Sequence, residues 1–443
     1  MKQRFQTYAE QNAPRYTSYP TAPHFSTAIG PADMRGWLAA LRPENTLSLY
    51  IHVPYCTRLC WYCGCNTYAA RRDEPLRDYV DTLLAEIDLV AAQCGSHRLT
   101  ELHWGGGTPN ILDAPRFEQI VDRLERNFES GEITHHAIEL DPRFLDMEKA
   151  AAYARRGVTR VSLGVQDLNP HVQAAIGRIQ PLRVVEGAIE TLRSAGLYNI
   201  NMDLMYGLPH QTRDDLSFTI EHAVRMQPGR IALFGYAHVP WFKKRQRLIP
   251  DAALPGASER FEQAAWARER LETLGYVAIG LDHFAHPDDA MARAASAKAL
   301  TRSFQGYVVE NADALIGLGP SAISTLPHGY AQNAAEPGAW ASAISDGALA
   351  TIRGHTLSAE DHTRWRLITQ IMCDFSADLS QLGGAAACAS EITALGPMIA
   401  DGLVRIEGDH VRLTDEGKPF CRLVALAFDA YASHAAARHS RAV

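Results

Sequence analysis

The chain has 443 residues, a net charge of -7 and 47% hydrophobic residues, as in a folded globular protein larger than one ordinary domain. Its charge gives no general reason to expect nucleic-acid binding, and no run approaches the roughly 20 apolar residues of a membrane span. The polar amino terminus lacks the apolar segment of a secretion signal. We therefore expect a cytoplasmic protein, whose cysteines serve as metal ligands or reactive thiols more readily than as disulfides.

Six short apolar runs alternate with helical patterns in the first half of the chain. The runs are 47–54, 101–107, 136–142, 160–167, 199–209 and 230–240. Between them apolar residues recur three and four apart, and the helical patterns at 147–157 and 181–196 end on glycine. Strands that alternate with crossover helices predict a parallel sheet, either wound on both sides or curled into a barrel.

Polar residues or glycines end nearly every predicted strand. They are the cysteines after 54, the glycines at 105–107, Glu139 with Asp141, Gln166 with Asp167, and Asp203. In parallel α/β folds the carboxyl ends of the strands hold the ligand. We therefore expect the functional site at this edge of the sheet.

The rest of the chain predicts an extension of the sheet and a smaller module. The apolar run 276–285 closes or extends the sheet, and Pro and Gly near 250–257 and 317–330 predict connections. Residues 401–431 read as a helix, two short strands and another helix, the order of a winged helix, but their low basic content favours a covering or docking role over DNA binding. We expect three parts: an N-terminal arm (1–45), a barrel with its extension (46–350) and a C-terminal helical module (351–443).

Four of the eight cysteines, Cys56, Cys60, Cys63 and Cys65, fall within ten positions. C-x3-C-x2-C supplies three thiolates on one loop, whereas a structural zinc site usually takes four ligands and a ferredoxin-type cluster takes four cysteines. Three thiolates would leave one iron of a [4Fe-4S] cluster open to a substrate or cofactor. Cys65 could be a fourth ligand, although C-x-C spacing makes ligation together with Cys63 awkward; zinc and a redox disulfide are the alternatives.

C-x3-C-x2-C with Tyr62 before the third cysteine is the signature of the radical S-adenosylmethionine (SAM) enzymes, which the chain resembles. From about residue 14 to the C-terminal module it also resembles the oxygen-independent coproporphyrinogen III dehydrogenase (oxidase) family of haem biosynthesis. The matching stretches, in this order, are RYTSYPTA, YIHVPYC, CGCN, HWGGGTP, GVQD, DLMYGLP and FQGY. The resemblance implies an α/β fold: a partial TIM-type (β/α)6 barrel of parallel strands, an N-terminal arm that covers the active site, and a C-terminal, mostly helical, winged-helix-like module.

The resemblance assigns Cys56, Cys60 and Cys63 to the cluster, whose open iron would bind the amino and carboxylate groups of SAM. The reduced cluster would cleave SAM to methionine and a 5'-deoxyadenosyl radical, and the family is described as holding a second SAM. The positions that match the two SAM sites are Tyr50, Tyr62, Gly106, Gly107, Thr108, Glu139, Gln166, Arg178, Asp203, Ala237 and Ile323.

Each of these residue types suits SAM, and each also has an ordinary structural explanation. Glycines let the backbone approach a charged amino group, and an arginine fork suits a carboxylate. Taken alone, the same glycines form a turn, Glu139 and Asp203 are strand-end charges, and the tyrosines belong to a core. The segment GRIQP at 177–181 departs from the family's usual N-R-x-Q around the arginine.

For the reaction, the resemblance implies conversion of coproporphyrinogen III to protoporphyrinogen IX, in which two of four propionates become vinyl groups. Arg15 is a candidate gate or propionate contact, Cys65 a candidate catalytic residue, and Gln305 and Asn311 further candidates. The spacing of His283 and His286 suits a metal, but an ordinary polar loop explains it better.

The resemblance also implies an electron donor such as a flavodoxin- or ferredoxin-type reductant, and a monomer with no nucleic-acid partner and no membrane span. One alternative is a haem chaperone on the same scaffold. Such relatives typically have an aromatic residue where Cys65 stands and an H-N-x-x-Y-W stretch where this chain reads RSFQGY. A plain electron carrier or a zinc protein is the third possibility.

Overall fold

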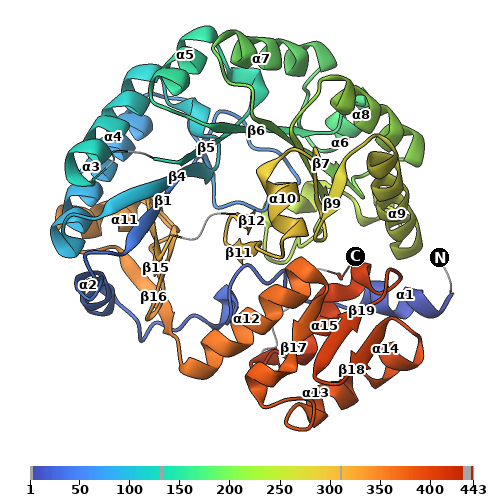
Figure 1. The fold of residues 1–443 in the computed structure, drawn as a ribbon. Coiled ribbons are helices and arrows are strands. Elements are labelled where there is room, and N and C mark those ends of the chain that lie inside the picture. Colours follow the sequence, from blue (N-terminus) through green and yellow to red (C-terminus); the bar gives the residue numbers. More distant parts are fainter. Residues whose placement is uncertain (1–2, 130, 132, 310–311, 433–440, 443) are drawn as a thin grey trace. The chain divides into compact units, whose positions relative to one another are not determined.

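The computed structural model describes residues 3–129, 131, 133–309, 312–432 and 441–442, which form two compact units (Figure 1). The cysteine-bearing unit comprises Phe25–Asp203 and Ala312–Thr356. The terminal unit comprises Met1–His24, Leu204–Asn311 and Leu357–Val443. Both units gather segments that are distant in the sequence. The division at residues 45 and 350 stays a prediction.

The cysteine-bearing unit is built on a sheet whose central strands are parallel. Its strands follow the order β16-β15-β14-β13-β1-β4-β5-β6-β7, and β1 pairs in parallel with both β13 and β4. Residues of β1 are buried almost continuously, including the polar Ser48 and His52, as expected for a strand covered on both faces. The strand bounds are β1 Thr46–Val53, β4 Arg98–Gly106, β5 His135–Leu140, β6 Arg160–Gln166, β7 Ile200–Tyr206, β13 Ala314–Leu318, β14 Ile323–Leu326, β15 Gly329–Asn333 and β16 Thr351–Thr356. The last three residues of β7 belong to the terminal unit.

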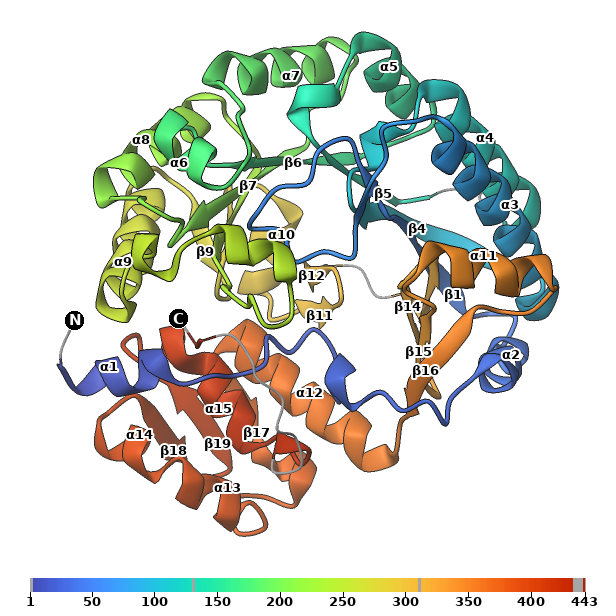
Figure 2. The same ribbon diagram turned by 180° about the vertical axis from the view of Figure 1, so that it is seen from behind.

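Helices follow the parallel strands and cover the outer side of the sheet in this unit (Figures 1 and 2). Side-chain caps begin two of them, since Asp113 and Asp146 each accept a hydrogen bond from a backbone N-H of the first turn. Gly157 and Gly196 follow two helices with φ of 70° and 90°, the left-handed conformation predicted for these positions. The helix bounds are α2 Pro31–Ala39, α3 Glu74–Cys94, α4 Ala114–Asn127, α5 Met147–Arg155, α6 Pro170–Ala175, α7 Leu182–Ser194 and α11 Pro337–Ser345.

One of the two predicted connections is in fact part of the sheet. The segment 317–330, expected to be connecting chain, lies mostly in β13, β14 and β15, so that prediction is wrong. Gly317 explains the miss, because a Cβ there would lie 2.7 Å from the Ile323 carbonyl oxygen and the close hairpin needs a glycine. The run 276–285, expected to close or extend the sheet, extends it as two antiparallel strands, β9 (Val277–Ile279) and β10 (His283–Ala285).

The terminal unit combines an antiparallel sheet edge with helices. Its strands β8, β10 and β9 are neighbours in that order, and β11 pairs with β12. Carboxyl-terminal to these, β17, β19 and β18 form the small sheet of the module predicted at 401–431, which gains one strand, β17, beyond the two expected. The strand bounds are β8 Arg230–Gly235, β11 Thr301–Ser303, β12 Gly306–Val308, β17 Ser376–Asp378, β18 Val404–Glu407 and β19 His410–Leu413.

One hydrophobic cluster of the terminal unit joins the two ends of the chain. Phe5 and Tyr8 pack against Phe420, with ring centroids 6.0 and 5.7 Å apart, and all three are buried. The N-terminal residues therefore form part of a core and not only an arm. The helix bounds are α1 Gln3–Glu10, α8 Arg213–Arg225, α9 Ala257–Thr273, α10 Ala290–Ser296, α12 Ala359–Asp374, α13 Ala389–Ala394, α14 Gly396–Ala400 and α15 Cys421–Ala427.

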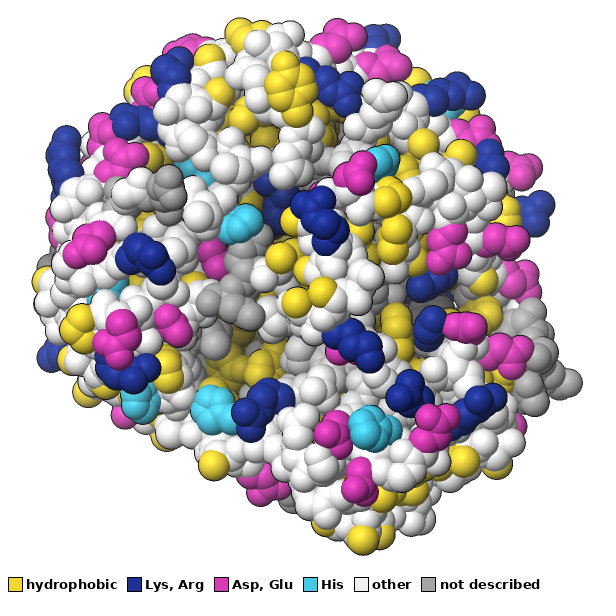
Figure 3. All heavy atoms as spheres, in the orientation of Figure 1, with side chains coloured by type: hydrophobic (Ala, Val, Ile, Leu, Met, Phe, Trp, Pro, Cys, Tyr) yellow, Lys and Arg dark blue, Asp and Glu magenta, His cyan; other side chains and the backbone are white. Residues whose placement is uncertain are grey.

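The described residues include no helix that combines the length and the apolar character needed to cross a bilayer. On the face drawn in Figure 3, Lys and Arg side chains are interspersed with Asp and Glu side chains. Nucleic-acid-binding domains gather basic residues on one face. The face shown therefore gives no support for such a partner.

Candidate active site

The cysteine cluster lies on a loop of the cysteine-bearing unit that follows β1 and runs between the short parallel strands β2 (Tyr55–Cys56) and β3 (Tyr68–Ala69) (Figure 2). The chain after β4 holds this loop. Gly107 donates its N-H to the Val53 carbonyl at 2.7 Å, and Thr108 donates to the Tyr55 carbonyl at 2.9 Å. A Cβ on Gly107 would lie 2.6 Å from that Tyr55 oxygen, so only glycine allows this approach.

The first cysteine sulfur lies among hydroxyl groups. Thr108 donates its hydroxyl to Cys56 Sγ at 3.1 Å, and Thr67 Oγ1 lies 3.2 Å from the same sulfur. Burial raises the pKa of the Cys56 thiol, and the two threonines act against that rise. Hydroxyl donors stabilise a thiolate more than a thiol, so this position suits an anionic metal ligand.

The second cysteine sulfur faces two arginines. Arg178 Nη1 lies 3.5 Å from Cys60 Sγ, and Arg143 Nη2 lies 4.0 Å from it. Asp141 joins the two cations at 3.1 and 2.6 Å. Burial favours the neutral acid, but Arg178 and Arg143 outweigh it and hold the pKa of Asp141 below its usual value. The carboxylate stays charged and fixes both guanidinium groups beside the sulfur.

The third and fourth cysteines lie at the open end of the loop. The Cys65 backbone N-H donates to Cys63 Sγ at 3.4 Å, and the Cys65 side chain is exposed whereas that of Cys63 is half-buried. In the part of the chain that the structure describes, no group of three His, Cys, Asp or Glu side chains is arranged around a single metal ion. A [4Fe-4S] cluster takes one thiolate per iron. Three sulfurs on one loop, each beside a hydrogen-bond donor, suit three irons of such a cluster.

A line of polar side chains crosses the sheet beside the loop. Tyr50 on β1 stacks on His103 of β4, with ring centroids 5.8 Å apart, and His103 Nε2 lies 3.3 Å from Glu139 Oε1 on β5. Ser162 on β6 donates to Asp203 on β7 at 2.9 Å. The parallel register sets this line, since Tyr50 pairs with His103 and Glu139 with Ser162.

Asp203 does not close its strand as expected. It lies in the middle of β7, which continues to Tyr206, and its second oxygen accepts from Asn201 Nδ2 at 2.8 Å. The apolar run around it gives no sign of where the strand stops. Glu139, one residue before the end of β5, agrees with the expected placement.

The glycines before Thr108 are required by packing within the protein. A Cβ on Gly106, whose φ is 105°, would lie 2.7 Å from the His52 ring, and a Cβ on Gly105 would lie 3.0 Å from a Glu139 carboxylate oxygen. His52 Nε2 in turn lies 3.0 Å from the Asn66 carbonyl on the cysteine loop. The glycine run therefore brings β1, β4 and the loop together, whatever it also offers to a ligand.

Arg178 makes more contacts with the protein than a residue reserved for a ligand carboxylate would make. Besides Cys60 and Asp141, it donates Nη2 to the Gly164 carbonyl at 2.6 Å and Nε to Gln180 at 3.2 Å. Gln166 adopts φ of 67° at the end of β6, a strained backbone of the kind found at functional sites. The charge of Arg178 lowers the pKa of Tyr62, although burial dominates and raises it.

The cysteine-bearing unit thus holds most of the residues predicted from the sequence. Ile323 begins β14, and its backbone packs on Gly317, which pairs with Tyr50. Three predicted residues, Arg15, Gln305 and Ala237, belong to the terminal unit, where Arg15 and Ala237 line one cavity. Their SAM, gate and catalytic assignments, like those of the other predicted site residues, stay predictions. Asn311 lies outside the described residues.

The two histidines with metal-like spacing do not share the expected polar loop, because His283 begins β10 and His286 follows the end of that strand. His283 Nδ1 lies 2.7 Å from its neighbour Asp282, and His286 is exposed, 3.6 Å from Asp288. The described residues hold no cluster that would make them metal ligands.

Sequence reasoning missed His103, His52 and Arg143. His103 lies two residues before Gly105, and side chains two residues apart in a strand point to the same face. This periodicity could have placed His103 on the face of Tyr50 and Glu139. Arg143 follows Asp141 in a helical turn, where Asp141 accepts from the Arg143 N-H and side chain. No sequence signal shows that this arginine faces a cysteine 83 residues earlier.

Comparisons with known proteins agree with this geometry. Residues 50–223 match the model of the radical SAM superfamily. An oxygen-independent coproporphyrinogen III oxidase from Bradyrhizobium diazoefficiens is 44% identical over 99% of this chain and 98% of its own, and one from Paracoccus denitrificans is 42% identical over 98% and 97%. The chain belongs to the family of oxygen-independent coproporphyrinogen III oxidases.

A solved structure of this family shares the fold. The coproporphyrinogen III oxidase of Escherichia coli, described as a radical SAM enzyme, is 34% identical, with a TM-score of 0.89 over 95% of this chain and all of that one. This match confirms the family resemblance that the sequence indicated. It also confirms the expected α/β fold class, a partial barrel with a helical carboxyl-terminal region. The cofactors of this radical SAM family are a [4Fe-4S] cluster and SAM, as predicted.

Proposed function

We propose that this chain is an oxidoreductase that converts coproporphyrinogen III to protoporphyrinogen IX without oxygen. The observation that carries the proposal is the loop bearing Cys56, Cys60 and Cys63, with a hydrogen-bond donor beside each of the three sulfurs. The chain is similar over its whole length to oxidases of this name. Each reacting propionate would lose one hydrogen atom, carbon dioxide and one electron as it becomes a vinyl group.

In this proposal Cys56, Cys60 and Cys63 hold the cluster. The bound cluster and SAM supply the one-electron chemistry that abstracts a hydrogen atom from the substrate. The hydroxyl groups at Cys56 and the arginines at Cys60 offset the negative charge of the thiolates. Glu139, whose side chain is 46% exposed, presents a carboxylate toward the space beside the glycine run, where it suits an amino group or ribose hydroxyls. Cys65 is retained as a candidate for a role close to the cluster.

An anaerobic assay tests the function. Full-length protein with a reconstituted cluster, given SAM, a reductant and coproporphyrinogen III, should release two carbon dioxide molecules per porphyrinogen and yield protoporphyrinogen IX. A spectral change on addition of SAM would support an open iron. A loaded enzyme that formed no product would defeat the proposal. Haem binding without decarboxylation would instead favour the chaperone, and zinc without iron would favour the zinc protein.

Three further properties belong to the same proposal. We propose a flavodoxin- or ferredoxin-type reductant as the electron donor, because the cluster must be reduced by one electron at a time. We also propose a monomer, supported by α1 and α15 covering one hydrophobic cluster within a single chain. The cytoplasm is the proposed compartment, supported by the lability of such clusters in oxidising surroundings. Gel filtration and pull-down of the reductant test the first two.

A further inference from the structure

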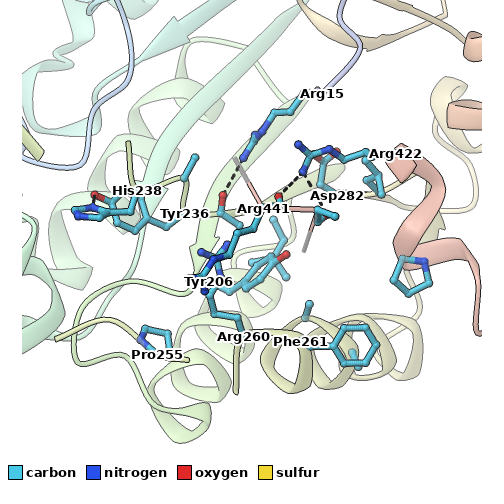
Figure 4. Close-up of a pocket in the computed structure, with 18 of the residues that line it drawn as sticks. Arg15, Tyr206, Tyr236, His238, Pro255, Arg260, Phe261, Asp282, Arg422 and Arg441 are labelled. Atoms are coloured by element: carbon cyan, nitrogen blue, oxygen red, sulfur yellow. Dashed lines mark hydrogen bonds between the residues drawn. The ribbon is translucent and has the colours of Figure 1, made fainter. Parts of the chain in front are cut away.

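The terminal unit contains a cavity of about 610 Å³ with an excess of positive charge (Figure 4). Seven arginine and lysine residues line it, against two aspartates, Asp251 and Asp282. Apolar residues, including Leu233, Phe261 and Phe284, make up part of the wall. Its size is in the range of small-molecule sites, and the mixture of apolar wall and cations suits a hydrophobic molecule with several carboxylates.

Four of the seven cations have structural roles that account for them. Arg302 donates to the carbonyls of Tyr16 and Arg15 and lies over the Tyr307 ring. Arg422 donates to backbone carbonyls at both ends of the chain. Two others pair with carboxylates: Arg268 with Glu272 and Lys418 with Asp415. These contacts account for most of the donors of the four, although Arg302 Nη1 is also buried without a hydrogen-bond partner in the described part of the chain.

The remaining three, Arg15, Arg260 and Arg441, have no carboxylate within ion-pair distance among the described residues. Arg15 donates one hydrogen bond, to the Gly235 carbonyl at 3.0 Å. Arg260, on α9, is half-buried, and its Nε is fully buried with no hydrogen-bond partner in the described part of the chain. A buried donor without a partner is costly, so the site of Arg260 is incomplete as the protein alone presents it.

Two glycines make the room in which the Arg260 side chain lies. A Cβ on Gly207, whose φ is 75°, would be 3.1 Å from Arg260 Nε. A Cβ on Gly235 would be 3.2 Å from Arg260 Nη2 and 2.8 Å from the Tyr206 hydroxyl. Figure 4 shows Arg260 and Arg441 beside Tyr206, with Arg15 above them in the view. The backbone is therefore shaped to admit this guanidinium and keep it beside the cavity.

The arrangement is also electrostatically unfavourable without an anion. Burial is the largest cause that lowers the pKa of Arg260. Tyr206 and Tyr236 raise this pKa, whereas the neighbouring charges of Arg441 and Arg15 lower it. Like charges gathered in a partly buried space destabilise one another. A carboxylate placed among them would satisfy the free donors and remove the repulsion, and the arginine fork matches a carboxylate with two hydrogen bonds.

We infer that Arg260, together with Arg15, binds a propionate group of the tetrapyrrole substrate in this cavity. The inference rests on the proposed function, which supplies a ring with apolar edges and four carboxylates, two of which persist in the product. It assigns to Arg260 a substrate-binding role that sequence reasoning did not reach. The carboxylate of SAM has the same chemistry, so the experiment must separate the two ligands.

Binding can be measured apart from turnover. Coproporphyrin III, the oxidised and fluorescent form of the substrate, is titrated into full-length protein with its cluster, and SAM is titrated separately through the cluster spectrum. Arg260→Gln should weaken coproporphyrin III binding by about 10- to 100-fold and leave the SAM dissociation constant unchanged. Arg15→Gln should show a smaller loss, and Arg260→Lys a partial recovery. Arg270→Gln is the matched control, because Arg270 lies on the same helix, pairs with Glu221 at 2.9 Å and does not line the cavity.

The outcomes are distinct. The inference is overturned if a folded, cluster-loaded Arg260→Gln protein binds coproporphyrin III as tightly as the parent does. It is also overturned if that variant loses affinity for SAM and not for coproporphyrin III. In turnover, the same variant should raise KM for coproporphyrinogen III about as much as it weakens binding, with a smaller change in kcat. Arg260-dependent binding in a protein that never decarboxylates would support this inference while defeating the proposed function.

Discussion

The three cysteine sulfurs that we assign to the cluster differ in their surroundings. Cys56 contacts hydroxyl groups, Cys60 faces arginines, and Cys63 accepts a backbone N-H. Spacing alone predicted the three thiolates, because three cysteines within eight positions must share a loop. It could not predict Arg143, whose position depends on how β5 and the loop meet in space. Nor could it predict that most donors of Arg178 are taken by the protein.

Cys65→Ser should keep the cluster, whereas Cys56→Ser, Cys60→Ser and Cys63→Ser should each lose it. Cys65 is exposed at the open end of the loop, and C-x-C spacing makes its ligation together with Cys63 awkward, so we expect its thiol not to hold the cluster. A cluster left with two protein thiolates is poorly held. Iron and sulfide content after anaerobic reconstitution gives the answer. Iron in Cys65→Ser as low as in the other three would make Cys65 a ligand.

Among the elements, alternating runs and helical patterns were sufficient to predict the parallel strands and their order along the chain. They failed for β13 to β16, because these strands are short and three of the four contain a glycine, a residue typical of turns. Gly317 and Gly354 occur there because neighbouring backbone leaves no space for a side chain. That requirement comes from strand pairing across distant segments, which no local pattern contains.

Buried His136 connects two elements and makes their stability depend on pH. Its Nε2 accepts from Trp104 Nε1 of β4 at 2.9 Å, so the proton is on Nδ1, which donates to the Arg156 carbonyl after α5 at 3.1 Å. Burial lowers the pKa of His136 to about 4, so the unfolded chain binds more protons between pH 6.5 and 4. Acidification through this range should therefore cost about 3 kcal/mol of stability.

Thermal unfolding followed from pH 7 to pH 4 measures this effect. His136→Gln keeps one acceptor for Trp104 and one donor for Arg156 but does not titrate, so its melting temperature should fall less on acidification than that of the parent. The exposed His328 provides the control, His328→Gln, which should follow the parent. Equal acid sensitivity in His136→Gln would show that other groups cause the loss.

For the molecule as a whole, the main feature is that each unit is assembled from separated stretches of chain. Arg422 illustrates this in the terminal unit. It donates to Pro14 and Ala13 near one end of the chain and to Arg441 and Ala442 near the other. Burial lowers the pKa of Arg422 to about 9, with Arg15 adding to the effect. Composition cannot reveal such a residue, because it is one of many arginines until both ends are placed.

Arg422→Lys should loosen both ends of the chain. A lysine keeps the charge but cannot reach four carbonyls with a planar fork, and buried acceptors left without donors should cost at least about 2 kcal/mol. We expect a lower melting temperature and faster proteolytic cleavage before residue 15. Arg412→Gln, which breaks an exposed pair with Glu407, should change neither. Resistance to protease equal to the parent's would contradict the role given to Arg422.

The packing of Phe5 and Tyr8 against Phe420 has a consequence for biosynthesis. The first helix emerges from the ribosome long before its partner aromatic residues are translated. Until then its apolar side has nothing native to cover it, while the stretch carrying the four clustered cysteines is already exposed to solvent. A nascent chain halted before residue 420 would therefore leave that helix undocked, and the emergence of the segment around Phe420 is the event that allows this cluster to form.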